Sequence, residues 1–520
     1  MKKIIITCCV ALTMFGVTSC GDDFLSVEPS SKLPVDGYYN SDSRIMESVT
    51  AAYQPMQWYD YYNGWAPLCL VFDSMSDDVY VGGQDTNDQP QIHLISQFLS
   101  DPVNSIDGAW GASYTGINRS NLIIEYVENY EMSETDKKKF IAEARVLRAW
   151  YYLVLWKLWG NIPYYDVNLS FPYIAEQKTA SEIYELIESD LADVIDSNIL
   201  AMKESDKWAG RATQAMASMI YAEYVMYQKD ESKYTKALGY MKNIISSGQY
   251  SLQPYKNLWE TEYEWNAETI FDINYIAKGG KRDWGAADAT GGTVVPSMIG
   301  INSFSGSPDY AGGWGFEPVA KEAYDAFEDN DIRRDISILN INKYIADNAA
   351  NGVTIDYGGR YQDTGFFLRK YLGRIGGNTG SVASADLNWD NNLRIYRYAE
   401  TLLNAAELAL RTGDGSAQSY LDQVRSRAGV ASIPANLDNI LLERRLEFVG
   451  EGKRYFDLVR FGKAAEVLKA KGGKVLNMKG GSYTVDAIPE RVQWTENKKY
   501  IPIPQSEIEA SQGSITQNPY

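Results

Sequence analysis

The chain has 520 residues, of which 45% are hydrophobic and 13% aromatic, and its formal net charge is -19. A chain of this length can bury an ample core without help from disulfides. Its acidic balance disfavours binding to nucleic acid or to an anionic membrane surface.

The first twenty residues have the order of a secretory signal: two lysines, an apolar stretch from Ile4 to Val17, then small residues. The apolar stretch is too short to span a bilayer. Val17-Thr18-Ser19-Cys20 resembles the bacterial lipobox, in which the cysteine becomes the lipidated first residue. An ordinary signal peptide with a chance cysteine is the alternative. We predict cleavage before Cys20 and acylation there by two or more chains, which would anchor the protein firmly.

Gly21-Asp22-Asp23 directly follows the lipidated cysteine and resembles the acidic tag that sends some lipoproteins to the outer cell face. Loss of the two lysines brings the net charge to -21, so attachment to the membrane must come from lipid. A polar tether reaches to Pro34. Cys69 is the one cysteine left beyond the anchor, so we expect no intrachain disulfide.

Several segments predict helices, because apolar or small residues recur at steps of three and four. One of them, Lys139–Leu158, is expected to have a single apolar face. Paired helices of this kind indicate tetratricopeptide-like stacking. The expected helices are 139–158, 179–195, 212–226, 234–245 and one through 399–410 that ends near Gly413.

Two long segments interrupt this helical pattern, Ala277–Trp314 and Asn348–Asp390. The first is rich in glycine pairs but also carries aromatic residues, which argue against disorder. Such inserts are usually functional. We therefore expect a mainly α fold, a tetratricopeptide-like helical scaffold with long irregular loops and little strand. The expected parts are a signal (1–19), a tether (20–34), an N-terminal helical-repeat region (35–260) and a C-terminal region with ligand loops (261–520).

Groups that could carry out catalysis are scarce. His93 is the sole histidine, so a Ser-His-Asp triad or a histidine-rich zinc site is hard to build. Cys69 with His93 is possible, but a buried structural cysteine and a surface histidine are the simpler interpretation. We see no phosphate- or dinucleotide-binding motif and no calcium-loop signature, and we expect no cofactor and no metal. A glycosidase needs only two carboxylates, and these are abundant without any catalytic signature.

Aromatic residues give a stronger signal, with 38 Tyr and 13 Trp, and with the run Trp58-Tyr59-Asp60-Tyr61-Tyr62-Asn63-Gly64-Trp65. Sugar rings stack their C–H faces on aromatic planes, while nearby polar groups reach the hydroxyls. Many of these aromatics will be core residues. Those in glycine-rich loops favour a saccharide-binding surface.

The C-terminal half contains several distinctive motifs: 442–448 (LERRLEF), 450–454 (GEGKR), 455–462 (YFDLVRFG), 500–504 (YIPIP) and 517–520 (QNPY). Together with segments 23–25, 142–152 and 424–429, these motifs closely resemble the SusD/RagB family over essentially the whole mature chain. The Gly that usually precedes the last Tyr in this family is missing.

The resemblance implies a helical, non-catalytic lipoprotein that captures nutrients, usually glycans, and delivers them to a SusC-like TonB-dependent outer-membrane transporter. Glu443, Arg444, Glu451 and Arg454 are then structural ion pairs. By position, the resemblance implies a ligand platform of Trp65, Trp284, Trp314 and Tyr310. Trp58 or Tyr62 could replace Trp65, and Asp78 and Asn302 are candidates for hydroxyl contacts.

We therefore predict a cell-surface protein that binds a neutral oligo- or polysaccharide. Three alternatives stay open: a peptide-capturing RagB-like protein, a glycoside hydrolase, and a helical-repeat adaptor whose loop aromatics are buried.

Overall fold

The computed structural model describes residues 39, 41–60, 66–286, 290–469, 471–479 and 482–520, without the side chains of 471–490. The chain divides into two units, 1–46 and 47–520. Of the first unit the structure describes Tyr39 and the residues from Ser41, which begin helix α3 (Asp42–Trp58). The helices and strands from α4 onward belong to the second unit.

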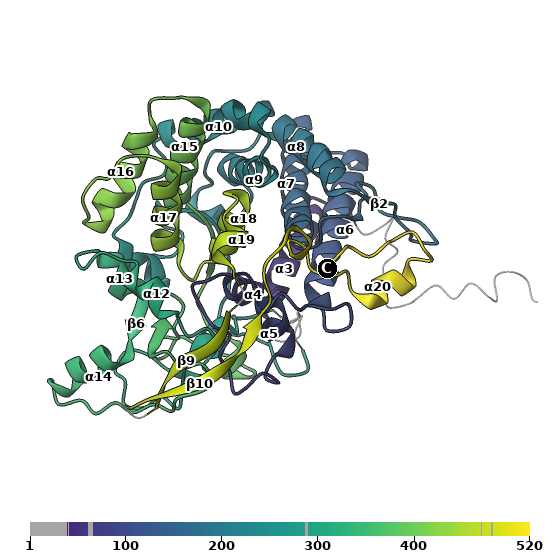
Figure 1. Ribbon diagram of the computed structural model, residues 1–520. Coiled ribbons are helices and arrows are strands. Elements are labelled where there is room, and N and C mark those ends of the chain that lie inside the picture. The colour runs from purple at the N-terminus through teal and green to yellow at the C-terminus, as the bar shows by residue number, and fades with distance from the viewer. Residues whose placement is uncertain (1–38, 40, 61–65, 287–289, 470, 480–481) are drawn as a thin grey trace, which may run out of the picture. The chain divides into compact units, whose positions relative to one another are not determined.

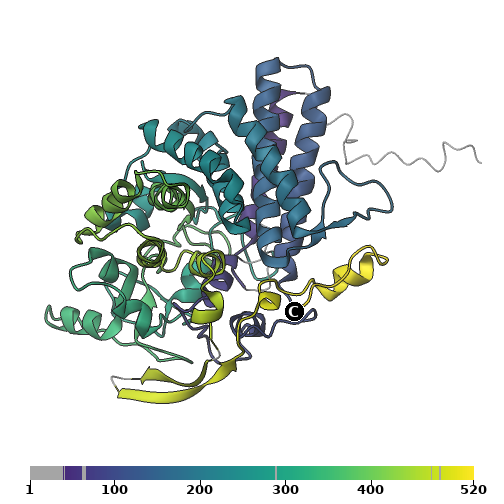
Figure 2. The same cartoon turned by 45° about the horizontal axis from the view of Figure 1, so that its top comes forward.

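The scaffold of the second unit is a row of helices in which each contacts the next. Figures 1 and 2 both show α6 to α9 side by side. This arrangement confirms the predicted class, mainly α with short strands, and the five predicted helices correspond to α7, α8, α9, α10 and α15. In order, the row is α6 (Asp107–Asn129), α7 (Glu134–Trp159), α8 (Ala180–Ser197), α9 (Gln214–Gln228), α10 (Tyr234–Ser246), α15 (Tyr398–Thr412), α16 (Ala417–Ala428) and α17 (Leu437–Phe448).

Local chemistry sets the ends of these helices. Thr179 and Glu182 form a reciprocal capping box at the start of α8. Ser133 and Thr213 accept backbone N–H groups at the starts of α7 and α9. Gly413 ends α15 with a φ of 73°, which glycine adopts without strain. No described helix is long and apolar enough to cross a membrane.

Helix α7 differs from its prediction. Every residue from Val146 to Trp159 is buried, so the second half of the helix has no solvent face. The reason is that α6, α8 and α9 all pack against it. A helix surrounded by neighbours is apolar on all sides rather than along one stripe.

A glycine allows α6 and α7 to approach each other closely. A Cβ at Gly116 would lie 2.2 Å from the ring of Tyr151, and this ring is fixed because its hydroxyl donates to the carbonyl of Ala52 at 2.6 Å. We expect Gly116→Ala to lower the free energy of unfolding by about 2 kcal/mol through overpacking. Urea unfolding measures this.

Gly111, in the same helix, is the matched control. A Cβ at this position would have no atom within 4 Å. Gly111→Ala should therefore raise the free energy of unfolding by up to about 1 kcal/mol, because alanine has the higher helix propensity. Equal effects of the two substitutions would contradict the proposed steric difference.

The segment between α10 and α15 is an insert in the helical row. Strand β3 (Thr269–Ile273) pairs antiparallel with β8 (Leu393–Arg397), and Arg397 is also the N-cap of α15. The two ends of residues 274–392 are therefore held together, and we call this segment the insert. Its elements are α11 (Val295–Ile299), β4 (Ile301–Asn302), β5 (Gly312–Gly313), α12 (Lys321–Asp325), α13 (Ile332–Ser337), β6 (Ile338–Asn340), α14 (Ile341–Ala349), β7 (Phe366–Leu368) and η6 (Ala385–Leu387).

The strands of the described residues occur as separate pairs and are two to five residues long, except for the antiparallel pair of β9 (Lys471–Lys479) with β10 (Ser482–Arg491), which have 9 and 10 residues. Within the insert β4 pairs parallel with β5, and β6 pairs antiparallel with β7. The remaining elements of the second unit are α4 (Leu68–Ser74), α5 (Pro90–Ser96), β1 (Ile162–Pro163), β2 (Gln177–Lys178), η2 (Asp206–Trp208), η3 (Glu231–Lys233), η4 (Tyr255–Trp259), η5 (Thr261–Tyr263), α18 (Arg454–Arg460), α19 (Ala464–Val467), η7 (Glu496–Lys498) and α20 (Gln505–Ala510).

Candidate functional site

Two of the predicted aromatic residues meet in the insert. The ring centroids of Trp284 and Trp314 lie 6.0 Å apart with an angle of 33° between the ring planes. Trp284 is 57% exposed and Trp314 is half-buried. Exposed indole rings that lie side by side are unusual on a protein surface unless they bind something. We call these two residues the tryptophan pair.

The backbone of Trp314 is seated on α11. Its N–H donates to the carbonyl of Ser297 at 2.7 Å. A Cβ on Gly313 would lie 2.4 Å from that same carbonyl oxygen and 2.5 Å from the Cα of Gly300. Only residues without a Cβ allow this approach, so the two glycines set how deeply Trp314 sits. Ser297 also accepts, through its hydroxyl, the indole N–H of Trp389 at 2.8 Å.

The turn that carries Trp284 is held by the residues before it. Arg282 is fully buried and pairs with Asp60, and its Nη2 donates to the carbonyl of Gln57 at 2.5 Å. The Arg282 carbonyl accepts from Nδ2 of Asn388 at 2.9 Å. A hydrogen bond from the Ser384 hydroxyl lowers the pKa of Asp283 and holds this carboxylate beside Trp284.

The structure corrects two of the predicted ligand contacts. Tyr310 is 5% exposed, and its hydroxyl accepts a hydrogen bond from Nε of Arg369 at 2.6 Å. The side chain therefore links two segments of the insert. Asp78 is 1% exposed and accepts from Nε of Arg445 at 2.6 Å. Both side chains are buried and form hydrogen bonds with arginines of the protein itself.

The other predicted contacts have separate outcomes. Asn302 is half-buried, and its Nδ2 donates to the carbonyl of Gly358 at 3.1 Å. Trp58 is buried, with the guanidinium of Arg119 5.1 Å from its ring centroid. Trp65 and Tyr62 lie outside the residues that the structure describes.

Sequence reasoning missed the buried residues that are bonded to the segments carrying the tryptophan pair. These are Asp60, Arg282, Ser297 and Asn388, all at most 2% exposed. No local pattern marks them, because their partners come from distant segments. The sequence did contain one indication of this site: Gly300 and Gly313, whose close approach lies next to the predicted aromatic residue Trp314.

The C-terminal carboxylates form a buried ion network with arginines and a lysine. Glu443 pairs with Arg333 at 2.6 Å, and Arg454 pairs with Asp77 at 2.8 Å. The four residues predicted to make structural ion pairs all do so, with partners that include Arg425, Lys370, Arg397, Glu400 and Asp457.

Glu447 is the most heavily paired carboxylate of this network. It contacts Arg333 at 3.0 Å, Arg397 at 2.8 Å and Arg427 at 2.5 Å. Burial alone would raise the pKa of Glu447, but the three guanidinium groups outweigh burial and hold this pKa well below its usual range. Such a carboxylate stays ionised and cannot act as the proton donor that a glycosidase requires.

Cys69 and His93 are poorly suited to nucleophilic chemistry. Burial raises the pKa of the Cys69 thiol, which disfavours the reactive thiolate. His93 is 3% exposed, so the prediction of a surface histidine is wrong. Burial lowers the pKa of His93 to about 4, and its ring lies 6.0 Å from that of Tyr361. Among the described residues, no group of three or more His, Cys, Asp and Glu side chains could hold a metal ion.

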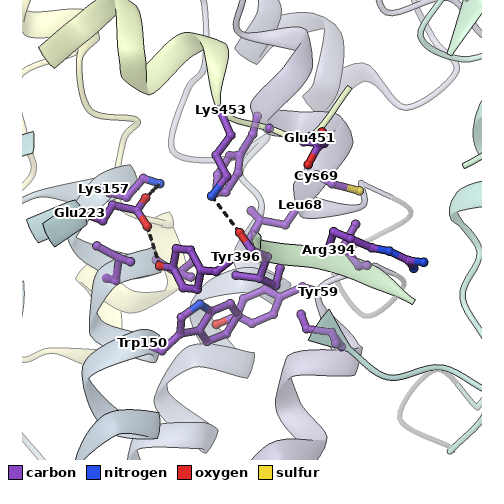
Figure 3. A pocket seen from close by; sticks show the side chains of 17 residues that line it. Tyr59, Leu68, Cys69, Trp150, Lys157, Glu223, Arg394, Tyr396, Glu451 and Lys453 are labelled. Carbon is purple, nitrogen blue, oxygen red and sulfur yellow. Dashed lines mark hydrogen bonds and ion pairs between the residues drawn. The ribbon is translucent and has the colours of Figure 1, made fainter. Parts of the chain in front are cut away.

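A separate internal cavity of about 80 Å³ lies where β3 and β8 meet α7 and α9. Figure 3 shows Lys157, Glu223 and Tyr396 joined by hydrogen bonds on one side of it, with Trp150 and Tyr59 below. Pockets that hold a small ligand usually exceed about 300 Å³. This cavity is therefore too small for a sugar chain.

The fold and the tryptophan pair together define a helical-repeat protein with two neighbouring tryptophans on an insert. A comparison with protein families agrees: the profile described as "SusD family" matches residues 258–520, and one described as "Starch-binding associating with outer membrane" matches residues 23–223. The chain belongs to the SusD family.

Individual relatives are similar over nearly their full length. A surface glycan-binding protein A from Bacteroides thetaiotaomicron, solved in complex with laminarihexaose, is 44% identical, with a TM-score of 0.84 over 92% of this chain and 100% of that one. A laminarin-binding SusD-like protein is 30% identical, with a TM-score of 0.80 over 92% and 100%. A SusD-like protein from Bacteroides ovatus is 25% identical over 92% of this chain and 86% of its own.

Proposed function

We propose that this protein captures a neutral glucan of the laminarin type at the cell surface and passes it, unchanged, to a SusC-like TonB-dependent transporter in the outer membrane. The tryptophan pair is the observation that carries the proposal. The choice of glucan is supported by the similarity to a protein solved with laminarihexaose.

The tryptophan pair suits a sugar chain because its apolar faces are held at a fixed separation and tilt. Successive sugar rings can lie against the two indoles, and a ring quadrupole attracts the sugar C–H groups. Asp283 beside Trp284, and Asn302, supply polar groups for hydroxyls. Trp65 remains our candidate for a third aromatic contact.

A non-catalytic role is supported by the ion pairs of three carboxylates, Asp77, Asp78 and Glu447. Asp77 and Asp78 are paired with Arg454 and Arg445, and Glu447 lies among three arginines. None of these carboxylates is an unpaired acid beside the tryptophan pair. A peptide-capturing role has less support, because paired indole faces suit sugar rings and one similar protein was solved with laminarihexaose.

The proposed attachment of the protein to the membrane rests on the amino-terminal sequence. We propose that a lipid on Cys20 anchors the protein, that Gly21-Asp22-Asp23 directs it outward, and that residues 20–34 form the tether. Cys20→Ala should abolish incorporation of tritiated palmitate and release the protein from membranes. Labelling that persists in this variant would contradict the anchor.

Calorimetric titration of the mature wild-type protein tests the ligand. We expect binding of laminarihexaose, weaker binding of maltohexaose and cellohexaose, and no heat from a mixed hexapeptide library. Reducing sugar should not appear after prolonged incubation with laminarin. Absence of binding to every glycan, or hydrolysis abolished by a single carboxylate substitution, would refute the proposal.

A further inference from the structure

The tryptophan pair depends on one buried ion pair, Asp60 with Arg282. Their side chains are 2% and 0% exposed. Arg282 also donates to the carbonyl of Gln57 at 2.5 Å, and its guanidinium lies 5.5 Å from the ring centroid of Tyr275. The guanidinium is thus fixed by a carboxylate, a carbonyl and an aromatic ring.

The second oxygen of Asp60 reaches a different segment. Asp60 Oδ2 accepts the backbone N–H of Val294 at 3.1 Å, and Val294 is the N-cap residue of α11. Helix α11 carries Ser297, whose carbonyl accepts the N–H of Trp314. On the other side, Arg282 precedes Trp284 by two residues. The Asp60 carboxylate is therefore bonded both to the turn that carries Trp284 and to helix α11, which holds the backbone of Trp314.

We propose that Asp60 and Arg282 are positioning residues that set the separation and tilt of the tryptophan pair for the glycan. This inference rests on the proposed function for its ligand. Neither residue touches the sugar, since both are buried. Their effect is pre-organisation: without the shared carboxylate, the turn at Trp284 and helix α11 would have to be brought together when the glycan binds, at a cost in affinity.

A buried ion pair could instead serve only the fold, and burial of charge is itself weak evidence of a special role. The structure offers a matched comparison. Arg444 pairs with Asp457 at 2.8 Å, and the two side chains are 3% and 5% exposed. This second pair lies between α17 and α18, outside the insert. A purely structural role predicts the same outcome for both pairs.

The test compares Arg282→Lys with Arg444→Lys in the full mature chain. Lysine keeps the charge but has a single nitrogen, so at position 282 it cannot bind Asp60 and the Gln57 carbonyl as the guanidinium does. We expect Arg282→Lys to weaken laminarihexaose binding about fivefold and Asp60→Asn about tenfold or more, with a less favourable binding entropy. Arg444→Lys should lower the melting temperature and leave the affinity of the folded protein unchanged.

Hydrogen exchange provides a readout that needs no ligand. Amides of 281–286 and 294–299 should exchange faster in Asp60→Asn than in the wild type, while Arg444→Lys leaves these segments unchanged. Unchanged exchange there, or affinity within twofold of wild type in both Asp60 and Arg282 variants, would overturn the inference. If the wild type binds no laminarihexaose, the proposed function fails, and exchange alone decides whether Asp60 positions the pair.

Discussion

Replacing Trp314 by alanine should weaken laminarihexaose binding roughly thirtyfold, about 2 kcal/mol, because the variant loses one of the two stacking surfaces. Trp284→Ala should have an effect of the same order. The backbone supports of both residues remain, so the variants should fold normally. Titration calorimetry of the purified proteins, with melting curves as a check, measures both effects.

Trp208→Ala is the matched control. Trp208 is 39% exposed on η2, and its ring lies near Lys207 and Arg211 rather than beside a second tryptophan. Its removal should leave the affinity within twofold of wild type. If Trp208→Ala weakens binding as much as Trp314→Ala does, or if neither does, the tryptophan pair is not the glycan surface.

Glu447→Gln should destabilise the protein by about 3–5 kcal/mol at pH 7, the range expected when one partner of a buried ion pair is removed. The substitution removes one negative charge from the buried network, so the positive charges of Arg333, Arg397 and Arg427 are less fully compensated. Denaturant unfolding measures the loss. Glu466→Gln is the control, since Glu466 is exposed and its contact with Lys463 at 3.5 Å lies at the surface.

The dependence on pH gives this prediction a second check. The folded-state pKa of Glu447 lies below its ordinary value of 4.5. A depressed carboxyl pKa contributes stability that is complete above the unfolded-state pKa and is lost as the pH falls below it. The stability gap between wild type and Glu447→Gln should therefore be constant from pH 6 to 8 and narrow below about pH 4.5. A gap that widens in acid would contradict the ion-pair account.

The scaffold could be predicted from the sequence because helix periodicity is a local property. Steps of three and four residues identified α8, α9, α10 and α15 to within a few residues at each end. Burial on all sides of α7 was not predictable, because it depends on the three helices that surround it. Two of the aromatic residues that were singled out in the glycine-rich segment, Trp284 and Trp314, lie beside each other in the structure.

The individual contacts of the site were harder to predict, because exposure depends on partners that are distant in the chain. Asp78 is buried by Arg445, 367 residues away. Tyr310 is held by Arg369, whose position next to it no local pattern indicates. Asp60 was visible only as a polar residue in an aromatic run, and its bond to Arg282 spans 222 residues. Long-range pairing of this kind appears only in the folded chain.

The closure of the insert by β3 and β8 has a consequence for how specificity can change. Loops between two paired strands can vary in length and composition while the helices on either side keep their register, so a relative's ligand loops could be grafted here as a cassette. The graft has one requirement, because Arg282, Arg333 and Lys370 belong to the insert and pair with the buried carboxylates Asp60, Glu443, Glu447 and Glu451 outside it. A transplanted cassette must include those three cations, and the recipient should then acquire the sugar preference of the donor.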